Sequence, residues 1–352
     1  KKVTLKCKVS VTKYVSPEAK KKANVLNATT KYQPLAKLAA QHGFKLGTVV
    51  NYTNVTTNDN YKNLVKYHFN SLTAGNEFKA YSLLDQAKSA KSKDGMPVMN
   101  YDKADTIISF AKENGIQMRG HVLVWHAYMC DWFFREGYDT GKKYVSKAVM
   151  QKRLQYYIKE VITHFEKKYP GVIYCWDVVN EAVIGNSYRT DTVSAAESLD
   201  EIRHGNNSSW WHVYKSNEFI INAFRYANQY APKNVELYYN DFGETDNTKC
   251  EGIVKLINDV KAADGTRLDA FGMQAHYSVD SFSATQFKTV AEKYAKAAGK
   301  VQLTELDFKS SASYTSGMAT KESEYTKIAY CHKQLFDAIK GLKADGSNVS
   351  GL

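Results

Sequence analysis

Short runs of apolar, often β-branched or aromatic residues recur from Gln33 onward, and each is followed by a longer stretch of helical spacing. This alternation is typical of parallel strands joined by crossover helices, so it predicts an α/β fold. Seven complete strands are expected, at residues 44–51, 67–73, 117–125, 172–180, 235–240, 270–276 and 301–306. A (β/α)8 TIM barrel takes about 250 residues or more, so the 352 residues fit one such unit.

Helical spacing is clearest in residues 150–169 and 218–230. In the first of these, apolar residues recur at intervals of three and four and fall on one face of the helix. They are Leu154, Tyr157, Ile158, Val161, Ile162 and Phe165. Both segments are therefore predicted to be packing helices.

The two ends of the chain depart from this pattern. Residues 1–32 begin with a strand-like alternation and then become rich in Lys, Asn and Thr, which indicates an N-terminal extension or the tail of a preceding module. Residues 33–352 are predicted to be the barrel domain, with an incomplete C-terminal end. Residues 348–352 resemble an eighth strand cut short, which predicts an open seam with unpaired backbone groups. We expect the natural polypeptide to continue beyond Leu352, which the mass of the native chain would test.

Composition excludes several classes of protein. No apolar run approaches the roughly 18 residues that a membrane span requires. The net charge of +12 comes from scattered Lys and Arg, and no nucleic-acid-binding signature is present, so neither nucleic acid nor a membrane is an expected partner. The 25 tyrosines and 5 tryptophans would suit stacking against sugar rings, and equally a Tyr-rich surface and core.

Two further features leave their interpretation open. The link from 182 to 209 is long and polar and follows a predicted strand, where barrel loops carry ligand contacts, although a solvated insertion fits equally well. The five cysteines lie far apart without C-x-x-C spacing, and their odd number argues against a disulfide framework. They are Cys7, Cys130, Cys175, Cys250 and Cys331.

Carboxylates follow two of the predicted strands. Glu181 ends the apolar segment WDVVNEA (176–182), and Glu305 lies in VQLTELD (301–307). Alternation along a strand places Glu305 and Asp307 on the same side. These are the fourth and seventh strands, so both glutamates are expected at the barrel mouth, where catalytic groups lie. Such a pair suits glycoside hydrolysis, in which one carboxyl group protonates the leaving oxygen and the other attacks the anomeric carbon.

Four motifs in this order resemble glycoside hydrolase family 10, the xylanases, over about residues 33–352. They are RGHVLVWH (119–126), WDVVNEA, GMQAHY (272–277) and TELD (304–307), and LYYNDF (237–242) is also similar. The resemblance implies a retaining endo-β-1,4-xylanase with Glu181 as acid/base and Glu305 as nucleophile. It also implies that Asn180 donates to the 2-hydroxyl of the sugar before the scissile bond. His276 would hydrogen-bond the nucleophile, and Asp307 would orient His276.

The same resemblance implies the sugar contacts of the glycone side. These fall to Asn76, Lys79, His121, Trp125, His126 and Gln274, with Tyr128 where the family usually has Gln. Gly75 replaces an acid of the family's E-N-x-x-K pattern, so the preferred chain length or decoration is open. Two tryptophans that follow strand eight in the family are absent, so the chain ending at Leu352 is expected to bind xylan poorly unless another segment completes the barrel.

The alternatives concern metal and substrate. His121, His126 and His276 could instead suggest a metal site, but the ligand spacings expected of barrel metallohydrolases are absent, so neither a metal nor another cofactor is expected. A xylan-binding relative without activity, and a glycanase for another β-1,4 linkage, both remain open. The resemblance implies a secreted enzyme acting on xylan or xylo-oligosaccharides, and the further partners it suggests are flanking carbohydrate-binding modules or a complementing C-terminal segment. An unpaired cysteine does not exclude export from an organism living without oxygen.

Overall fold

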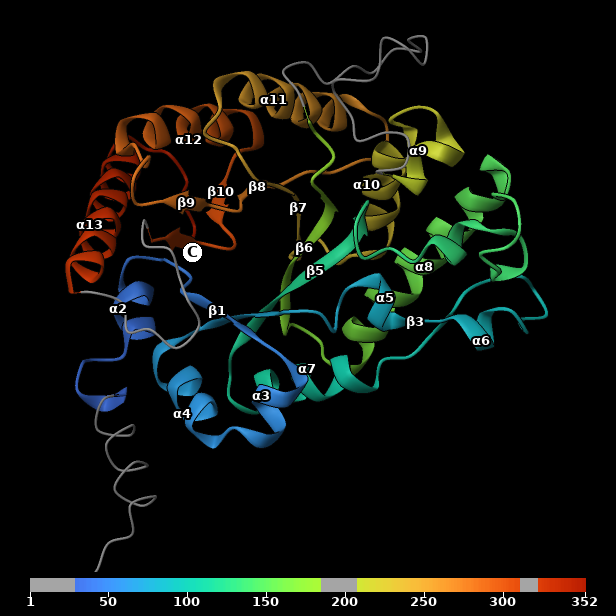
Figure 1. Ribbon diagram of the computed structural model, residues 1–352, viewed down its shortest axis with the longest axis horizontal. Coiled ribbons are helices and arrows are strands. Elements are labelled where there is room, and N and C mark those ends of the chain that lie inside the picture. The colour runs from blue at the N-terminus through green and yellow to red at the C-terminus, as the bar shows by residue number, and fades with distance from the viewer. Residues whose placement is uncertain (1–28, 185–207, 311–321) are drawn as a thin grey trace, which may run out of the picture.

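A computed structural model describes residues 29–184, 208–310 and 322–352 of the chain. Within them, seven parallel strands form one sheet in the order β1-β2-β5-β6-β7-β8-β10, with helices around the outside (Figure 1). They are β1 (Gly47–Val50), β2 (Ser71–Ala74), β5 (Gln117–Trp125), β6 (Ile173–Asn180), β7 (Glu236–Asp241), β8 (Ala270–Met273) and β10 (Val301–Leu303). Spatial neighbours follow chain order throughout, which agrees with the predicted (β/α)8 architecture.

Helices connect these strands on the outer face. They are α2 (Leu35–Gln41), α3 (Tyr52–Thr57), α4 (Asp59–His68), α5 (Ala80–Leu83), α6 (Gln86–Ser89), α7 (Asp102–Glu113), α8 (Lys147–Lys168), α9 (Ser209–Tyr214), α10 (Glu218–Tyr230), α11 (Asn247–Ala262), α12 (Ala284–Ala298) and α13 (Glu322–Ala344). Two small sheets pair β3 (Leu84–Asp85) with β4 (Val98–Met99), and β9 (His276–Ser278) with β11 (Asp307–Lys309). Short 3-10 turns occupy Asp131–Phe134 and Glu136–Tyr138.

The C-terminal residues lie between β10 and the residues that precede β1 (Figure 1). The backbone N–H groups of Val301 and Leu303 donate to Asn348 and Gly351, at 2.9 and 3.0 Å. On the other side, the N–H groups of Lys45 and Gly47 donate to Ser350 and Leu352, at 2.8 and 2.7 Å. The prediction of an open seam is therefore wrong for residues 348–352. These five residues form backbone hydrogen bonds both with β10 and with residues 45–47. A continuation beyond Leu352 stays a prediction.

The interior follows from the apolar strands. Residues of β5 and β6 are buried almost throughout, as expected for parallel strands covered on both faces. Gly120 of β5 is required by Trp176 of β6, since a Cβ at Gly120 would lie 2.2 Å from the Trp176 ring. The predicted apolar face of α8 is buried in full, and Phe165 on it stacks on Phe78 with ring centroids 4.6 Å apart.

Several predicted boundaries are wrong. Tyr67 and His68 end α4 instead of starting a strand, and β2 begins only at Ser71. The sixth strand stops at Met273 because Ala275 has a φ of 61°, which turns the chain before His276 begins β9. The seventh strand stops at Leu303, so Glu305 lies between β10 and β11 rather than within a strand.

Some predictions concern residues outside the described ranges. These include the strand-like start of the chain, Cys7 and most of the polar link between 182 and 209. Within the described ranges, Cys130, Cys175, Cys250 and Cys331 form no disulfide. None of the described helices has the length and apolar character that a membrane crossing requires.

Candidate active site

Glu181 directly follows β6 and is held by two side chains. Its backbone has a φ of 53°, and its N–H donates to the carbonyl of Asn240 at 2.9 Å. Trp125 Nε1 donates to Glu181 Oε2, and Gln274 Nε2 donates to Glu181 Oε1, each at 2.9 Å. Both carboxyl oxygens therefore have a fixed donor, from β5 on one side and from the end of β8 on the other.

Glu305 is bound by an amide and a histidine. Asn240 Nδ2 donates to Glu305 Oε1 at 3.0 Å, and His276 Nε2 lies 3.4 Å from Glu305 Oε2. The other nitrogen of His276, Nδ1, lies 2.6 Å from Asp307 Oδ2. Asp307, His276 and Glu305 thus form a continuous line of charge and hydrogen bonding, which the short β9–β11 pairing holds together.

The pKa values of Glu305 and His276 are shifted so that the two side chains carry opposite charges. Burial raises the pKa of Glu305, but the hydrogen bond from His276 and the charge of His121 outweigh it, so the net pKa is lowered. The hydrogen bonds to Glu305 and Asp307 raise the pKa of His276 to about 9, although burial acts in the opposite direction. Across the neutral range, Glu305 is therefore an anion facing a protonated imidazole.

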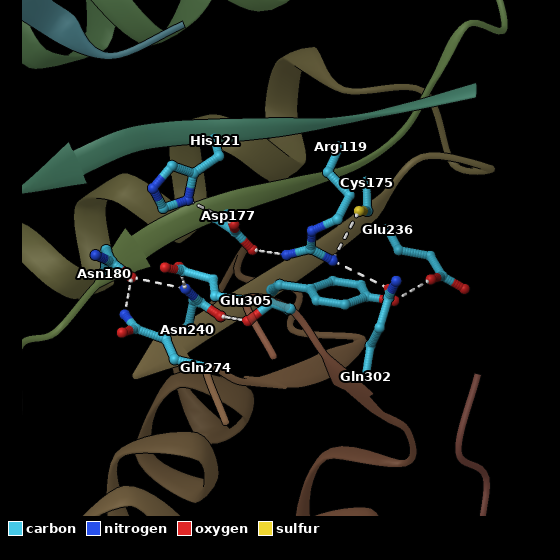
Figure 2. A network of polar contacts seen from close by, with 12 residues as sticks. Arg119, His121, Cys175, Asp177, Asn180, Glu236, Asn240, Gln274, Gln302 and Glu305 are labelled. Atoms are coloured by element: carbon cyan, nitrogen blue, oxygen red, sulfur yellow. Dashed lines mark hydrogen bonds and ion pairs between the residues drawn. The ribbon is translucent and has the colours of Figure 1, made fainter. Parts of the chain in front are cut away.

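Two asparagines and a glutamine connect the two glutamates, and Figure 2 shows the part of this network that joins Gln274, Asn180, Asn240 and Glu305. Asn240 Nδ2 donates to Asn180 Oδ1 at 2.9 Å as well as to Glu305. Gln274 Nε2 lies 3.3 Å from the same Asn180 oxygen and also donates to Glu181. Hence Glu181 and Glu305 belong to one hydrogen-bonded network at the carboxyl ends of β6, β7, β8 and β10.

Asn180 keeps one donor uncommitted. It is only 2% exposed, and its Nδ2 has no hydrogen-bond partner among the residues that the structure describes. A buried N–H group without a partner is costly, so such groups often await a ligand. The atom lies beside the Asn180 oxygen that joins the two glutamates, and it is therefore a donor for a molecule bound between them.

A buried ionic cluster of Asp177, Arg119 and His121 lies near Glu305 in the barrel interior (Figure 2). Asp177 pairs with Arg119, and His121 Nδ1 lies 2.9 Å from Asp177 Oδ2. Burial raises the pKa of Asp177, but Arg119 and His121 lower it by more than burial raises it. The net pKa is therefore lowered, and the carboxylate stays ionised. Arg119 also donates to Gln302 at 3.0 Å, which ties β5 to β10 across the barrel.

The remaining predicted residues lie around this centre. Lys79 Nζ donates to Asn76 Oδ1 at 3.2 Å. Burial lowers the pKa of Lys79, while the nearby carboxylates of Glu305 and Glu181 act in the opposite direction. The imidazole of His126 contacts Trp125 edge to face, with ring centroids 6.1 Å apart.

A cavity of about 380 Å³ opens beside Glu305. Of the predicted residues, it is lined by Lys79, His121, His276 and Glu305. A much smaller hollow is lined by Trp125, His126, Asn180 and Glu181. The other predicted residues line neither, but each contacts one that does, and they are Asn76, Tyr128, Gln274 and Asp307.

The three histidines have different partners. His121 pairs with Asp177 and His276 with Asp307 and Glu305, while His126 lies against Trp125. In the described part of the chain, no group of three or more His, Cys, Asp or Glu side chains could hold a metal ion.

Sequence reasoning missed several residues of the site. Asn240 was detectable, since it ends the fifth predicted strand as Asn180 ends the fourth. Thr304 Oγ1 donates to Asn240 Oδ1 at 2.6 Å, and Gly272 leaves room for that amide, because a Cβ there would lie 2.2 Å from Asn240 Oδ1. Buried Glu244 accepts from the N–H of Ala275 at 3.1 Å and so holds the turn between Gln274 and His276. No local signal indicated Glu244.

Comparisons with known proteins place this site in context. Residues 34–348 match the model of "Glycosyl hydrolase family 10". The chain is 40% identical over 235 residues to a protein of Caldicellulosiruptor saccharolyticus, a match that covers 65% of this chain and 70% of that one. It is 36% identical over 269 residues to endo-1,4-beta-xylanase Y of Acetivibrio thermocellus, covering 75% of this chain but only 24% of the relative.

Solved structures show the same fold. The CBM22-1 and GH10 modules of endo-1,4-beta-D-xylanase 10B from Clostridium thermocellum, complexed with xylohexaose, superpose with a TM-score of 0.75 at 32% identity. That match covers 88% of this chain and 58% of the other. A psychrophilic family 10 endo-beta-1,4-xylanase gives a TM-score of 0.72 at 29% identity, covering 91% and 88%.

Proposed function

Because this chain belongs to glycosyl hydrolase family 10, we propose that it is an endo-β-1,4-xylanase that cleaves xylan with net retention. The observation that carries the proposal is the network in which Asn180, Asn240 and Gln274 connect the carboxyl groups of Glu181 and Glu305. Two carboxyl groups in one network are the machinery that glycoside hydrolysis requires. The named relatives are xylanases, which supports xylan or xylo-oligosaccharides as the substrate.

The two carboxyl groups take different roles in this proposal. Glu305, kept ionised by His276, attacks the anomeric carbon while Glu181 donates its proton to the departing glycosidic oxygen. In the second step, Glu181 as a carboxylate takes a proton from water, which attacks the anomeric carbon and releases Glu305. Inversion at each step gives net retention.

The residues around the pair position the sugar. The uncommitted Nδ2 of Asn180 is the proposed donor to the 2-hydroxyl of the sugar before the scissile bond. Gln274 and Trp125 hold Glu181, and Asp307 orients His276. Four other proposed sugar contacts line or adjoin the cavity beside Glu305, and they are Asn76, Lys79, His121 and Tyr128. The fifth, His126, lines the smaller hollow beside Glu181.

The reaction and its substrate can be tested together. Incubation with xylan is expected to release xylo-oligosaccharides whose new reducing ends are initially β-anomers, as followed by proton NMR. The value of kcat/KM for 4-nitrophenyl β-xylobioside should exceed that for the cellobioside by at least about tenfold. A higher rate on the cellobioside would assign the scaffold to another β-1,4-glycan, and an absence of reducing-sugar release would favour a binding protein.

The pH dependence of the reaction is expected to depend on His276. The hydrogen bond from His276 lowers the pKa of Glu305, whereas burial raises it. In His276→Ala only the lowering contribution is lost, so the pKa of Glu305 rises and more Glu305 is protonated at a given acidic pH. The acid limb of the kcat/KM profile should therefore move to higher pH.

The matched control is His164→Ala. His164 Nε2 also lies 2.8 Å from an aspartate oxygen, that of Asp105, but between helices α8 and α7 rather than in the site. This variant should leave the acid limb where it is. An acid limb that stays in place, or moves to lower pH, in His276→Ala would show that His276 does not keep Glu305 ionised.

We also propose that the protein acts outside the cell, because polymeric xylan does not cross a membrane, and that carbohydrate-binding modules accompany it. The xylohexaose-bound relative contains a CBM22-1 module beside its GH10 module. Xylanase activity in the culture fluid of the source organism, rather than in washed cells, tests the first point.

A further inference from the structure

Two exposed tyrosines extend an aromatic surface that begins at Glu181. Trp125 donates to Glu181, the ring of Tyr128 lies 5.0 Å from that of Trp125, and the ring of Tyr81 lies 5.5 Å from that of Tyr128. Neighbouring rings are tilted by only 37° and 38°. Tyr128 is 54% exposed and Tyr81 is 41% exposed. A row of three rings thus leads from the carboxyl group to solvent.

The two tyrosines are held in place although they are exposed. Tyr128 has a φ of 51°, which is uncommon for a residue with a large side chain and is often found at functional sites. The backbone N–H of Tyr81, in α5, donates to the carbonyl of Tyr128 at 3.1 Å. Lys79 Nζ lies 4.6 Å from the Tyr128 ring centroid and 5.3 Å from that of Trp125, so the cation packs against both rings.

The row of Trp125, Tyr128 and Tyr81 lies toward the part of the cavity in which the glycone of the substrate would bind. The nucleophile bonds to the glycone, so residues that line the cavity beside Glu305 face that part of the substrate. Lys79 lines this cavity and also packs on Tyr128. Tyr81 is one ring farther from Glu181 than Tyr128, and therefore farther from the scissile bond.

We infer that Tyr81 and Tyr128 form an additional glycone subsite, which stacks a xylose unit remote from the bond that is cleaved. Aromatic faces carry partial negative charge and attract C–H groups, and a β-xylose unit presents axial C–H groups on the faces of its ring. This inference rests on the proposed xylanase function.

The experiment compares 4-nitrophenyl β-xylobioside with 4-nitrophenyl β-xylotrioside, which carries one further xylose toward the tyrosines. In the wild-type protein, the third xylose should raise kcat/KM. Tyr81→Ala and Tyr128→Ala should each lower the ratio of trioside to bioside by about fivefold, the effect of losing one aromatic contact. Tyr81→Phe and Tyr128→Phe retain the ring and should retain the ratio.

Tyr330→Ala is the matched control, because Tyr330 is 60% exposed on α13, which contributes no residue to the site. It should leave the ratio unchanged. Melting temperatures identify any variant that has lost its fold, and the test then depends on the Ala variant that remains folded. An unchanged ratio in both Ala variants would overturn the subsite, and so would equal losses in the Ala and Phe variants.

A failure of the proposed function is distinguishable from a failure of the subsite. If the wild-type protein hydrolyses neither aryl glycoside, the xylanase proposal is wrong. Calorimetric binding of xylotriose and xylobiose then tests the tyrosines, which should favour xylotriose in the wild type and lose that preference in the Ala variants. Equal binding of the two sugars by the wild type would exclude the subsite.

Discussion

Replacing Glu305 with Gln is expected to lower the hydrolysis of xylan and of activated aryl xylosides alike, by about 10⁴-fold or more. Gln has nearly the shape of Glu and still offers Oε1 to Asn240, so the network is disturbed little. An amide cannot serve as the nucleophile, and a better leaving group does not compensate because no covalent intermediate forms. Initial rates on both substrates measure the effect.

The control for this variant is Glu113→Gln, at the exposed end of α7, which makes the same chemical change away from the site. It should retain full activity. A folded Glu305→Gln protein that keeps a tenth or more of the wild-type rate on either substrate would show that another group is the nucleophile.

Replacing Glu181 with Ala is expected to separate the two classes of substrate. Loss of the general acid should slow xylan cleavage by about 10²- to 10⁴-fold, because the xylan leaving group needs a proton. An aryl xyloside with a good leaving group needs none, so its first step should remain fast. The second step lacks its base, so nitrophenol should appear as a burst followed by slow turnover, which stopped-flow absorbance records.

Glu181→Gln controls for lost contacts in this experiment. Ala removes the Glu181 oxygens that accept from Trp125 Nε1 and Gln274 Nε2, whereas Gln can still accept from Gln274. Both variants should give the burst, and azide, which needs no general base, should restore turnover. Equal losses on xylan and on the activated substrate would assign Glu181 another role.

Local pattern alone located most of the framework. The spans of β5 and α10 agree with the sequence-based prediction, because an apolar run or a helical face is a property of neighbouring residues. Glu181 and Glu305 were detectable for the same reason, since each follows an apolar segment. The boundaries were less predictable, as the positive φ of Ala275 ends a strand that the pattern would continue.

The sequence by itself determined the alternation of strands and helices, the family motifs and the carboxylates at the ends of the strands. Only the tertiary structure decided that Asn240 and Gln274 connect those carboxylates, that residues 348–352 bond with residues 45–47, and that Tyr81 lies beside Tyr128. These contacts join residues distant in the chain, and they depend on how strands align around the barrel. Hydrophobic periodicity specifies which side of an element is buried, but it does not specify which distant polar group that element meets.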